Sequence, residues 1–160
     1  MYSLPYFYTV QEPRNYITNI LLAEDDEDDR AFFAEALTDI NPNIELSHAH
    51  DGNQLLDLLN GGLNLLPEAV FLDLNMPLKN GFESLKEIRA NAALDKVAVI
   101  ILSTSWHQAT IDTVYTLGAN MYIIKPNSFH RLKDVIEKVL TTHLADIVPQ
   151  PPKENFVLSS

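Results

Sequence analysis

Five short segments with the sequence character of β-strands, most of them apolar throughout, constrain the fold more than any other feature. They cover residues 20–23, 44–49, 69–72, 97–102 and 121–124. Most lack the alternation of apolar and polar residues that marks a strand with one face in water. Unbroken short runs are typical of strands in a parallel sheet that is covered on both faces.

Segments with the apolar spacing of helices lie between and after these runs. They cover residues 30–39, 54–59, 82–89, 108–117 and 128–143. Asn41-Pro42-Asn43 ends the first, Gly118 is a left-handed C′ residue for the fourth, and Ser128 is the N-cap of the last. The alternation predicts an α/β fold with a doubly wound, five-stranded parallel sheet and five helices.

The chain divides into three zones by composition. Residues 1–16 form an aromatic N-terminal arm, which packs either on the domain or against a partner. Residues 17–144 hold the alternating strands and helices and form one domain. Residues 145–160 contain several prolines and predict an extended C-terminal tail.

Charge and cysteine content exclude several classes of function. The 22 acidic and 11 basic residues give a formal charge of −11, which argues against nucleic-acid binding. No cysteine is present, which excludes disulfides and thiolate chemistry and is compatible with a reducing cytoplasm. No apolar run approaches the ~20 residues that a membrane helix needs, and no signal peptide is evident. We expect a cytoplasmic protein.

Polar and charged residues follow the predicted strands. Glu24 and Asp25 come after the first strand, Asp73 after the third, Ser103 after the fourth and Lys125 after the fifth. Ligands of doubly wound sheets bind beyond the carboxyl ends of the strands. We therefore expect carboxylates, a hydroxyl and an ammonium group at one edge of the sheet.

This combination suits phosphoryl chemistry beside a metal ion. Crowded carboxylates repel one another, and Mg²⁺, which prefers oxygen ligands, relieves that repulsion. The Lys125 ammonium suits a phosphoryl oxygen. A carboxylate such as Asp73 can form an aspartyl phosphate by direct attack.

Four segments resemble the receiver domain, the response-regulator module of two-component signalling. They are ILLAEDDEDD (20–29), FLDLNMPLKNG (71–81), VIILSTS (99–105) and LGANMYIIKP (117–126). The resemblance covers about residues 18–144 and implies a flavodoxin-like sheet with strand order 2-1-3-4-5.

The resemblance also implies the metal ligands. Asp73 matches the phosphoacceptor, which also binds the metal. Asp25 matches the acid that binds Mg²⁺ directly, and Glu24 matches its neighbour that acts through water. Asn75 matches the residue whose backbone carbonyl is a ligand.

Further roles follow from the same resemblance. Ser103 matches the hydroxyl that contacts the phosphoryl group, and Lys125 matches the lysine of the site. Tyr122 matches the aromatic switch residue. The bond between Lys125 and Pro126 is a candidate cis peptide. Asp26 is an additional acid, which we expect to face solvent.

The implied function is that of a single-domain response regulator. Such a protein accepts a phosphoryl group on Asp73 and signals through protein–protein contacts or a phosphorelay; it is not an enzyme in the usual sense. The implied partner is a sensor histidine kinase, with the phytochrome type as a candidate, or a histidine phosphotransfer protein, and a homodimer stays open.

The alternative is a phosphorylation-independent binding module on the same fold. An aspartyl-phosphate phosphatase would need a second acid where Asn75 stands. His48 and His50 lack a third metal ligand and are expected at the surface. Trp106 marks a docking surface if it is exposed.

Overall fold

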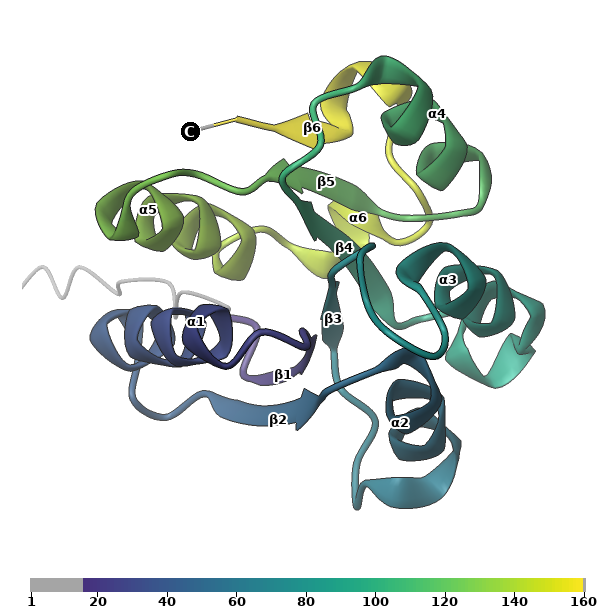
Figure 1. The fold of residues 1–160 in the computed structure, drawn as a ribbon, viewed down its shortest axis with the longest axis horizontal. Helices are drawn as coiled ribbons and strands as arrows, with labels where there is room; N and C mark the ends of the chain where they lie inside the picture. Colours follow the sequence, from purple (N-terminus) through teal and green to yellow (C-terminus); the bar gives the residue numbers. More distant parts are fainter. Residues whose placement is uncertain (1–15, 160) are drawn as a thin grey trace, which may run out of the picture.

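A six-stranded parallel sheet forms the centre of the protein (Figure 1). The structure is a computed structural model that describes residues 16–159; the predicted arm therefore lies almost entirely outside the described residues. The strand order is β2-β1-β3-β4-β5-β6, which confirms the predicted order 2-1-3-4-5 and adds one short strand. The strands are β1 (Asn19–Ala23), β2 (Glu45–Ala49), β3 (Ala69–Leu72), β4 (Ala98–Ser103), β5 (Met121–Ile124) and β6 (Val157–Leu158).

The five predicted helices are all present, with shifted ends. The helices are α1 (Glu27–Ile40), α2 (Gly52–Asp57), α3 (Gly81–Ala90), α4 (Gln108–Thr116), α5 (Phe129–Leu140) and α6 (Leu144–Ile147). Three short turns complete the chain: the π-helical η1 (Leu58–Gly62) and the 3-10 turns η2 (Ala92–Leu94) and η3 (Lys153–Asn155). Among the described residues, no helix is long and apolar enough to span a membrane.

The sheet separates two apolar cores. Successive side chains of a strand point to opposite faces. Leu21 and Val70 therefore pack toward α2, α3 and α4, while Ile20 and Phe71 pack toward α1 and α5. In Figure 1 these two helical layers lie on opposite sides of the sheet. This double coverage explains why β1, β3, β4 and β5 are mainly apolar, whereas the edge strand β2 has polar residues and is mostly not buried.

The segment after residue 144 differs from the expected extended tail. It forms α6, η3 and β6, and β6 pairs in parallel with β5. Phe156 is fully buried there, so an aromatic side chain anchors the segment on the domain. In the described chain the cis peptide bond is Val148–Pro149, and the candidate cis bond before Pro126 is therefore wrong.

Asn120 connects several elements through one buried amide. Its Oδ1 accepts hydrogen bonds from the Val99 N–H at 2.8 Å and from Arg89 Nη2 at 2.6 Å. Its Nδ2 donates to the Ile147 carbonyl oxygen at 2.7 Å. The side chain is almost completely buried. Its three partners lie on β4, α3 and α6, so the amide ties the end of the sheet to two helices.

We expect Asn120→Ala to lower the free energy of unfolding by about 2–4 kcal/mol, because it leaves buried polar groups without partners. Urea denaturation monitored by circular dichroism measures this change. Asn64→Ala is the matched control, because Asn64 is exposed and its loss should change stability by less than ~0.5 kcal/mol. Equal stability of the two variants would contradict the role given to the buried amide.

Candidate functional site

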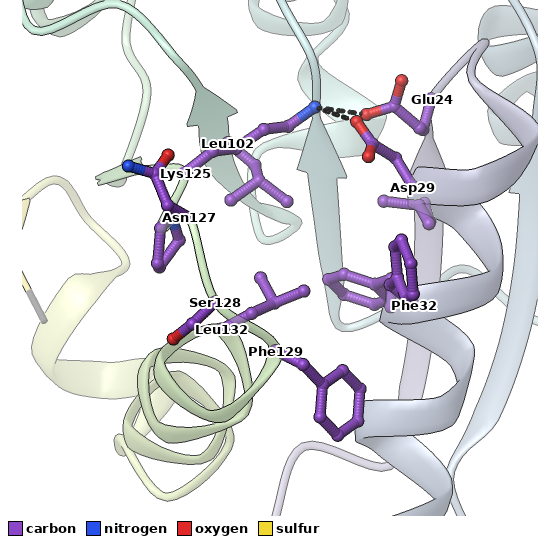
Figure 2. A pocket seen from close by; sticks show the side chains of 12 residues that line it. Glu24, Asp29, Phe32, Leu102, Lys125, Asn127, Ser128, Phe129 and Leu132 are labelled. Atoms are coloured by element: carbon purple, nitrogen blue, oxygen red, sulfur yellow. Dashed lines mark hydrogen bonds and ion pairs between the residues drawn. The ribbon is translucent and has the colours of Figure 1, made fainter.

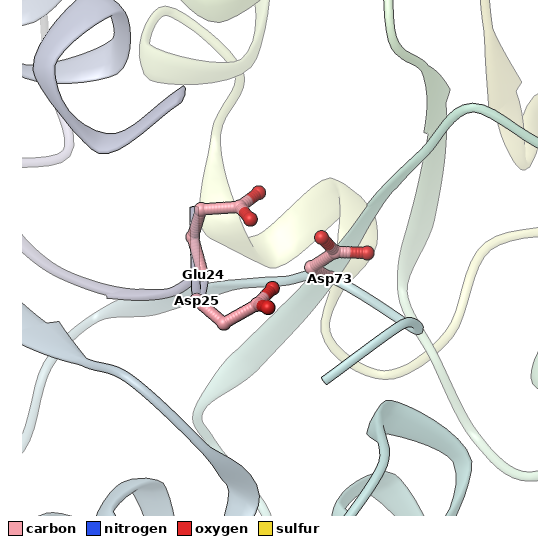
Figure 3. Close-up of side chains that lie close together, drawn as sticks. All are labelled: Glu24, Asp25 and Asp73. Carbon is pink, nitrogen blue, oxygen red and sulfur yellow. The ribbon is translucent and has the colours of Figure 1, made fainter. Parts of the chain in front are cut away.

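Three carboxyl groups meet at the carboxyl edge of the sheet, as predicted. Ala23 of β1 pairs with Leu72 of β3, so the residues that follow, Glu24 and Asp73, emerge side by side. The Asp73 N–H donates to the Ala23 carbonyl oxygen at 3.0 Å, which fixes this alignment. Carboxylate oxygens of Glu24, Asp25 and Asp73 lie within 4.8 Å of one another (Figure 3). Glu24 and Asp73 are buried, while Asp25 opens the cluster to solvent.

The Lys125 ammonium group is the positive charge that this cluster requires. Its Nζ lies 2.6 Å from Glu24 Oε2, 3.1 Å from Asp29 Oδ2 and 3.3 Å from Asp73 Oδ2. Figure 2 shows the side chain reaching from the end of β5 toward Glu24 and Asp29. The Lys125 N–H donates to the Ser103 carbonyl oxygen at 2.8 Å, which holds the backbone of both residues together. All three donors of the ammonium can thus point to carboxylates.

Burial and charge shift the pKa values of Glu24 and Lys125. Burial raises the pKa of Glu24 from 4.5 to about 7, the hydrogen bond from Lys125 opposes this rise, and the nearby charge of Asp73 adds to it. Burial alone would lower the pKa of Lys125. The hydrogen bond to Glu24 and the charge of Asp73 outweigh burial and raise it. Lys125 therefore stays charged at neutral pH.

The loop after β3 and the Lys125 side chain each hold one oxygen of the Asp73 carboxylate. Oδ1 accepts the Asn75 N–H at 3.0 Å, and Oδ2 faces Lys125. Gly81 closes this loop through a hydrogen bond from its N–H to the Leu74 carbonyl oxygen. A Cβ atom at Gly81 would lie 2.4 Å from the Asp73 carbonyl oxygen, so only glycine fits this approach.

Ser103 is the last residue of β4, and Tyr122 lies within the neighbouring strand β5, where it pairs with Ile101. Both side chains are fully buried. The Ser105 N–H donates to Ser103 Oγ at 3.2 Å, which leaves the hydroxyl hydrogen as a donor. The Tyr122 hydroxyl donates to the Ser105 carbonyl oxygen at 2.7 Å, so its ring points into the domain. The loop after β4 thus contacts both predicted switch residues.

Two site residues were missed in the sequence. Asp29 pairs with Lys125, and Arg30 Nη1 donates to the carbonyl oxygens of Glu24 at 2.9 Å and Asp25 at 2.8 Å. Arg30 thereby fixes the backbone that carries the acids. The start of the helix was the available signal: the Asp26 side chain accepts the Asp29 N–H at 2.9 Å, an N-cap that places both residues beside the strand end.

The donor set fits Mg²⁺. Three carboxylates supply the oxygen ligands that this ion prefers, and the exposed Asp25 leaves room for the water that it retains. The ligand role of the Asn75 carbonyl stays a prediction. Asp26 is exposed, as expected.

Trp106 and His50 lie at the surface, whereas His48, which was also expected there, is only partly exposed. Trp106 is 72% exposed and stacks on His107. His50 is exposed, whereas His48 is half-buried on β2.

A pocket of about 250 Å³ adjoins Lys125 between α1 and α5 (Figure 2). Asp29, Phe32 and Phe129 belong to its wall, together with apolar residues of the sheet. Phe32 remains 50% exposed. An apolar surface therefore lies directly beside the charged cluster.

The comparisons with known proteins agree on one family. Residues 20–137 match the family model of the response regulator receiver domain. Response regulator Rcp1 from Synechocystis sp. is 32% identical over 124 residues, covering 75% of this chain and 82% of that protein. The probable methanogenesis regulatory protein FilR2 from Methanothrix harundinacea is 32% identical over 123 residues, covering 75% and 79%.

Solved structures give the same result. The phosphorylated cyanobacterial phytochrome response regulator RcpA has a TM-score of 0.72 at 30% identity, covering 76% of this chain and 90% of that one. The Mn²⁺-bound form of response regulator Rcp1 has a TM-score of 0.69 at 30% identity, covering 76% and 91%.

The Glu24 pKa predicts a pH dependence of stability without metal. The folded state holds its proton up to about pH 7, whereas the unfolded state releases it near 4.5. The folded state is therefore favoured at low pH, and this contribution, at most about 3 kcal/mol, is lost as pH rises from about 4.5 to about 7. Glu24→Gln should lack this loss in urea titrations with a chelator present. Glu27→Gln, a change at an exposed position, should lose stability over this pH range as the wild type does. If the free energy of unfolding of wild type and of Glu24→Gln changed with pH in the same way, the raised pKa of Glu24 would be contradicted.

Proposed function

The chain belongs to the response regulator receiver family, and on that basis we propose that Asp73 accepts a phosphoryl group in a Mg²⁺-dependent reaction. The observation that carries this proposal is the position of Asp73. Its Oδ2 faces the Lys125 ammonium, and its carboxylate lies within 4.8 Å of two further acids. A nucleophile, a fixed positive charge and a set of metal-binding donors thus lie together at one edge of the sheet.

The transfer needs mainly positioning and neutralisation of charge. An Asp73 carboxylate oxygen bonds to phosphorus, while the bond from phosphorus to the donor histidine nitrogen breaks and the imidazole leaves with that electron pair. The Lys125 ammonium neutralises a phosphoryl oxygen, and the Ser103 hydroxyl donates to another. A Mg²⁺ ion held by Asp25, Asp73, the Asn75 carbonyl and Glu24 through water would supply further positive charge.

The conformational change that follows phosphorylation of Asp73 involves Ser103 and Tyr122. The phosphoryl group draws the Ser103 hydroxyl toward Asp73, and the Tyr122 ring occupies the space beside it. The hydrogen bond from Tyr122 to Ser105 supports this assignment, because Ser105 also donates to Ser103. The surface formed by α4, β5 and α5 changes as a result.

The donor is a sensor histidine kinase or a histidine phosphotransfer protein. The likeness to a cyanobacterial phytochrome response regulator and to a regulator in red light signaling of R. palustris supports a phytochrome-type kinase. The exposed Trp106 and the half-exposed Phe32 offer apolar surface for such a partner.

We expect wild-type protein to gain one labile phosphoryl group when it is incubated with Mg²⁺ and acetyl phosphate. Asp73→Asn should gain none, because its amide is not a nucleophile. Intact mass spectrometry measures the adduct. Asp28→Asn is the matched control, an exposed acid that should not affect the yield. Labelling of Asp73→Asn at the wild-type rate would refute the proposal and favour a phosphorylation-independent binding module.

We also expect Mg²⁺ to bind about tenfold more tightly at about pH 8 than at about pH 6, because the ion competes with the Glu24 proton whose pKa is about 7. Titration followed by melting temperature measures this, since a ligand of the folded state raises it. Glu24→Gln should flatten the pH dependence. No stabilisation of the wild type at either pH would contradict the proposed metal site.

A further inference from the structure

Residues 147–158, called here the C-terminal segment, contact the end of α4 and then cover the edge of β5 with the strand β6. The Tyr122 N–H donates to the Phe156 carbonyl oxygen at 2.9 Å. Tyr122 and Ile123 of β5 pair with Val157 and Leu158 of β6. The backbone of β5, the strand that carries Tyr122, is therefore hydrogen-bonded directly to the C-terminal segment.

Side chains hold the C-terminal segment on the end of α4 as well. Gln150 Nε2 donates to the carbonyl oxygens of Tyr115 at 2.7 Å and Ala119 at 2.6 Å. The Tyr115 hydroxyl donates back to the Pro151 carbonyl oxygen at 3.0 Å. The Tyr115 carbonyl oxygen also accepts the Gly118 N–H at 3.0 Å, so Gln150 adds a further hydrogen bond at the end of α4. Hydrogen bonds in both directions thus hold the C-terminal segment against the end of α4.

Phe156 fills the space between α4 and β5. It is fully buried, and its ring centroid lies 5.0 Å from that of Tyr115 in an edge-to-face arrangement. The Phe156 and Tyr122 centroids are 6.3 Å apart, with ring planes tilted by 54°. Tyr122 is therefore bounded by Phe156 on one side and bonded through its hydroxyl to Ser105 on the other.

We propose that Phe156 is a positioning residue for Tyr122, through which the C-terminal segment stabilises the inward ring and promotes phosphorylation of Asp73. The proposal rests on the proposed function for its second part. Outward rotation of Tyr122 would give up its contact with Phe156 and its hydrogen bond to Ser105. A segment that packs best on the inward ring raises the population of that arrangement.

Linkage makes the effect reciprocal. If phosphorylation and docking of the C-terminal segment both favour the inward Tyr122, each increases the equilibrium constant of the other by the same factor. Phosphorylation should therefore protect the backbone hydrogen bond between Tyr122 and Phe156. Loss of the Phe156 side chain lowers the population of the inward arrangement, the one that we propose reacts, and should therefore slow phosphorylation.

The test compares Phe156→Ala with Val157→Ala, a change at the neighbouring, partly exposed position. We expect Phe156→Ala to increase amide hydrogen exchange at Tyr122 at least tenfold and to slow phosphorylation by acetyl phosphate severalfold. Val157→Ala should change neither by more than about twofold. Phe156→Leu, which keeps an apolar side chain, should restore most of both and guards against a variant that fails to fold.

A double-mutant cycle separates positioning from a merely structural role. In a Tyr122→Ala background, Phe156→Ala should no longer slow phosphorylation, because the ring that it positions is gone. An equal slowing in both backgrounds would overturn the proposal. Unchanged Tyr122 exchange in Phe156→Ala would overturn it too, as would exchange that depends on protein concentration, which would place the C-terminal segment on a second copy.

The two proposals fail in different ways. If wild-type Asp73 takes up no phosphoryl group, the proposed function fails. Unchanged exchange at Tyr122 in Phe156→Ala, in a protein that is phosphorylated normally, leaves the proposed function intact and refutes the positioning role alone.

Discussion

The parallel pairing of β1, β3, β4 and β5 is the constraint on which the site depends. Parallel strands end at the same edge, so residues distant in sequence meet without any interaction of their own to bring them together. Backbone hydrogen bonds continue this alignment past the strands, from Asp73 to Ala23 and from Lys125 to Ser103. The charged groups are thus held by the sheet, and the apolar cores on both faces supply the stability that crowded carboxylates alone would reduce.

Lys125 makes this crowding tolerable. An ammonium group among three carboxylates offsets their repulsion, yet its distances to Glu24, Asp29 and Asp73 differ, with Asp73 the farthest. The acid proposed to react is therefore the one bound least closely by the lysine. The strongest partner, Glu24, is also the acid whose pKa rises to about 7. A proton, the Lys125 ammonium and a metal ion would therefore compete for the buried Glu24 carboxylate.

The sequence was sufficient for the central strands and for the position of the acids, hydroxyl and lysine at the edge of the sheet, because apolar runs specify buried strands and a polar residue follows each of these runs. It was insufficient for β6. Two residues after a proline-rich stretch carry no periodic signal, and only the tertiary contacts of Phe156 make them a strand. Asp29 was missed for a related reason: its ion pair depends on where α1 begins, and helix ends are poorly defined by apolar spacing. The role of Asn120 has no signal in the sequence either, because its three partners lie on three separate elements.

The separation of the two cores by the sheet has an evolutionary consequence. Tyr122 and Phe156 belong to the core shared with α2, α3 and α4, whereas Phe33 and Phe71 belong to the core beneath α1 and α5. Side chains that share no neighbours contribute nearly independently to stability. Substitutions could therefore accumulate in the core beneath α1 and α5 without disturbing the opposite layer. The two layers of this fold can thus diversify at separate rates within one domain.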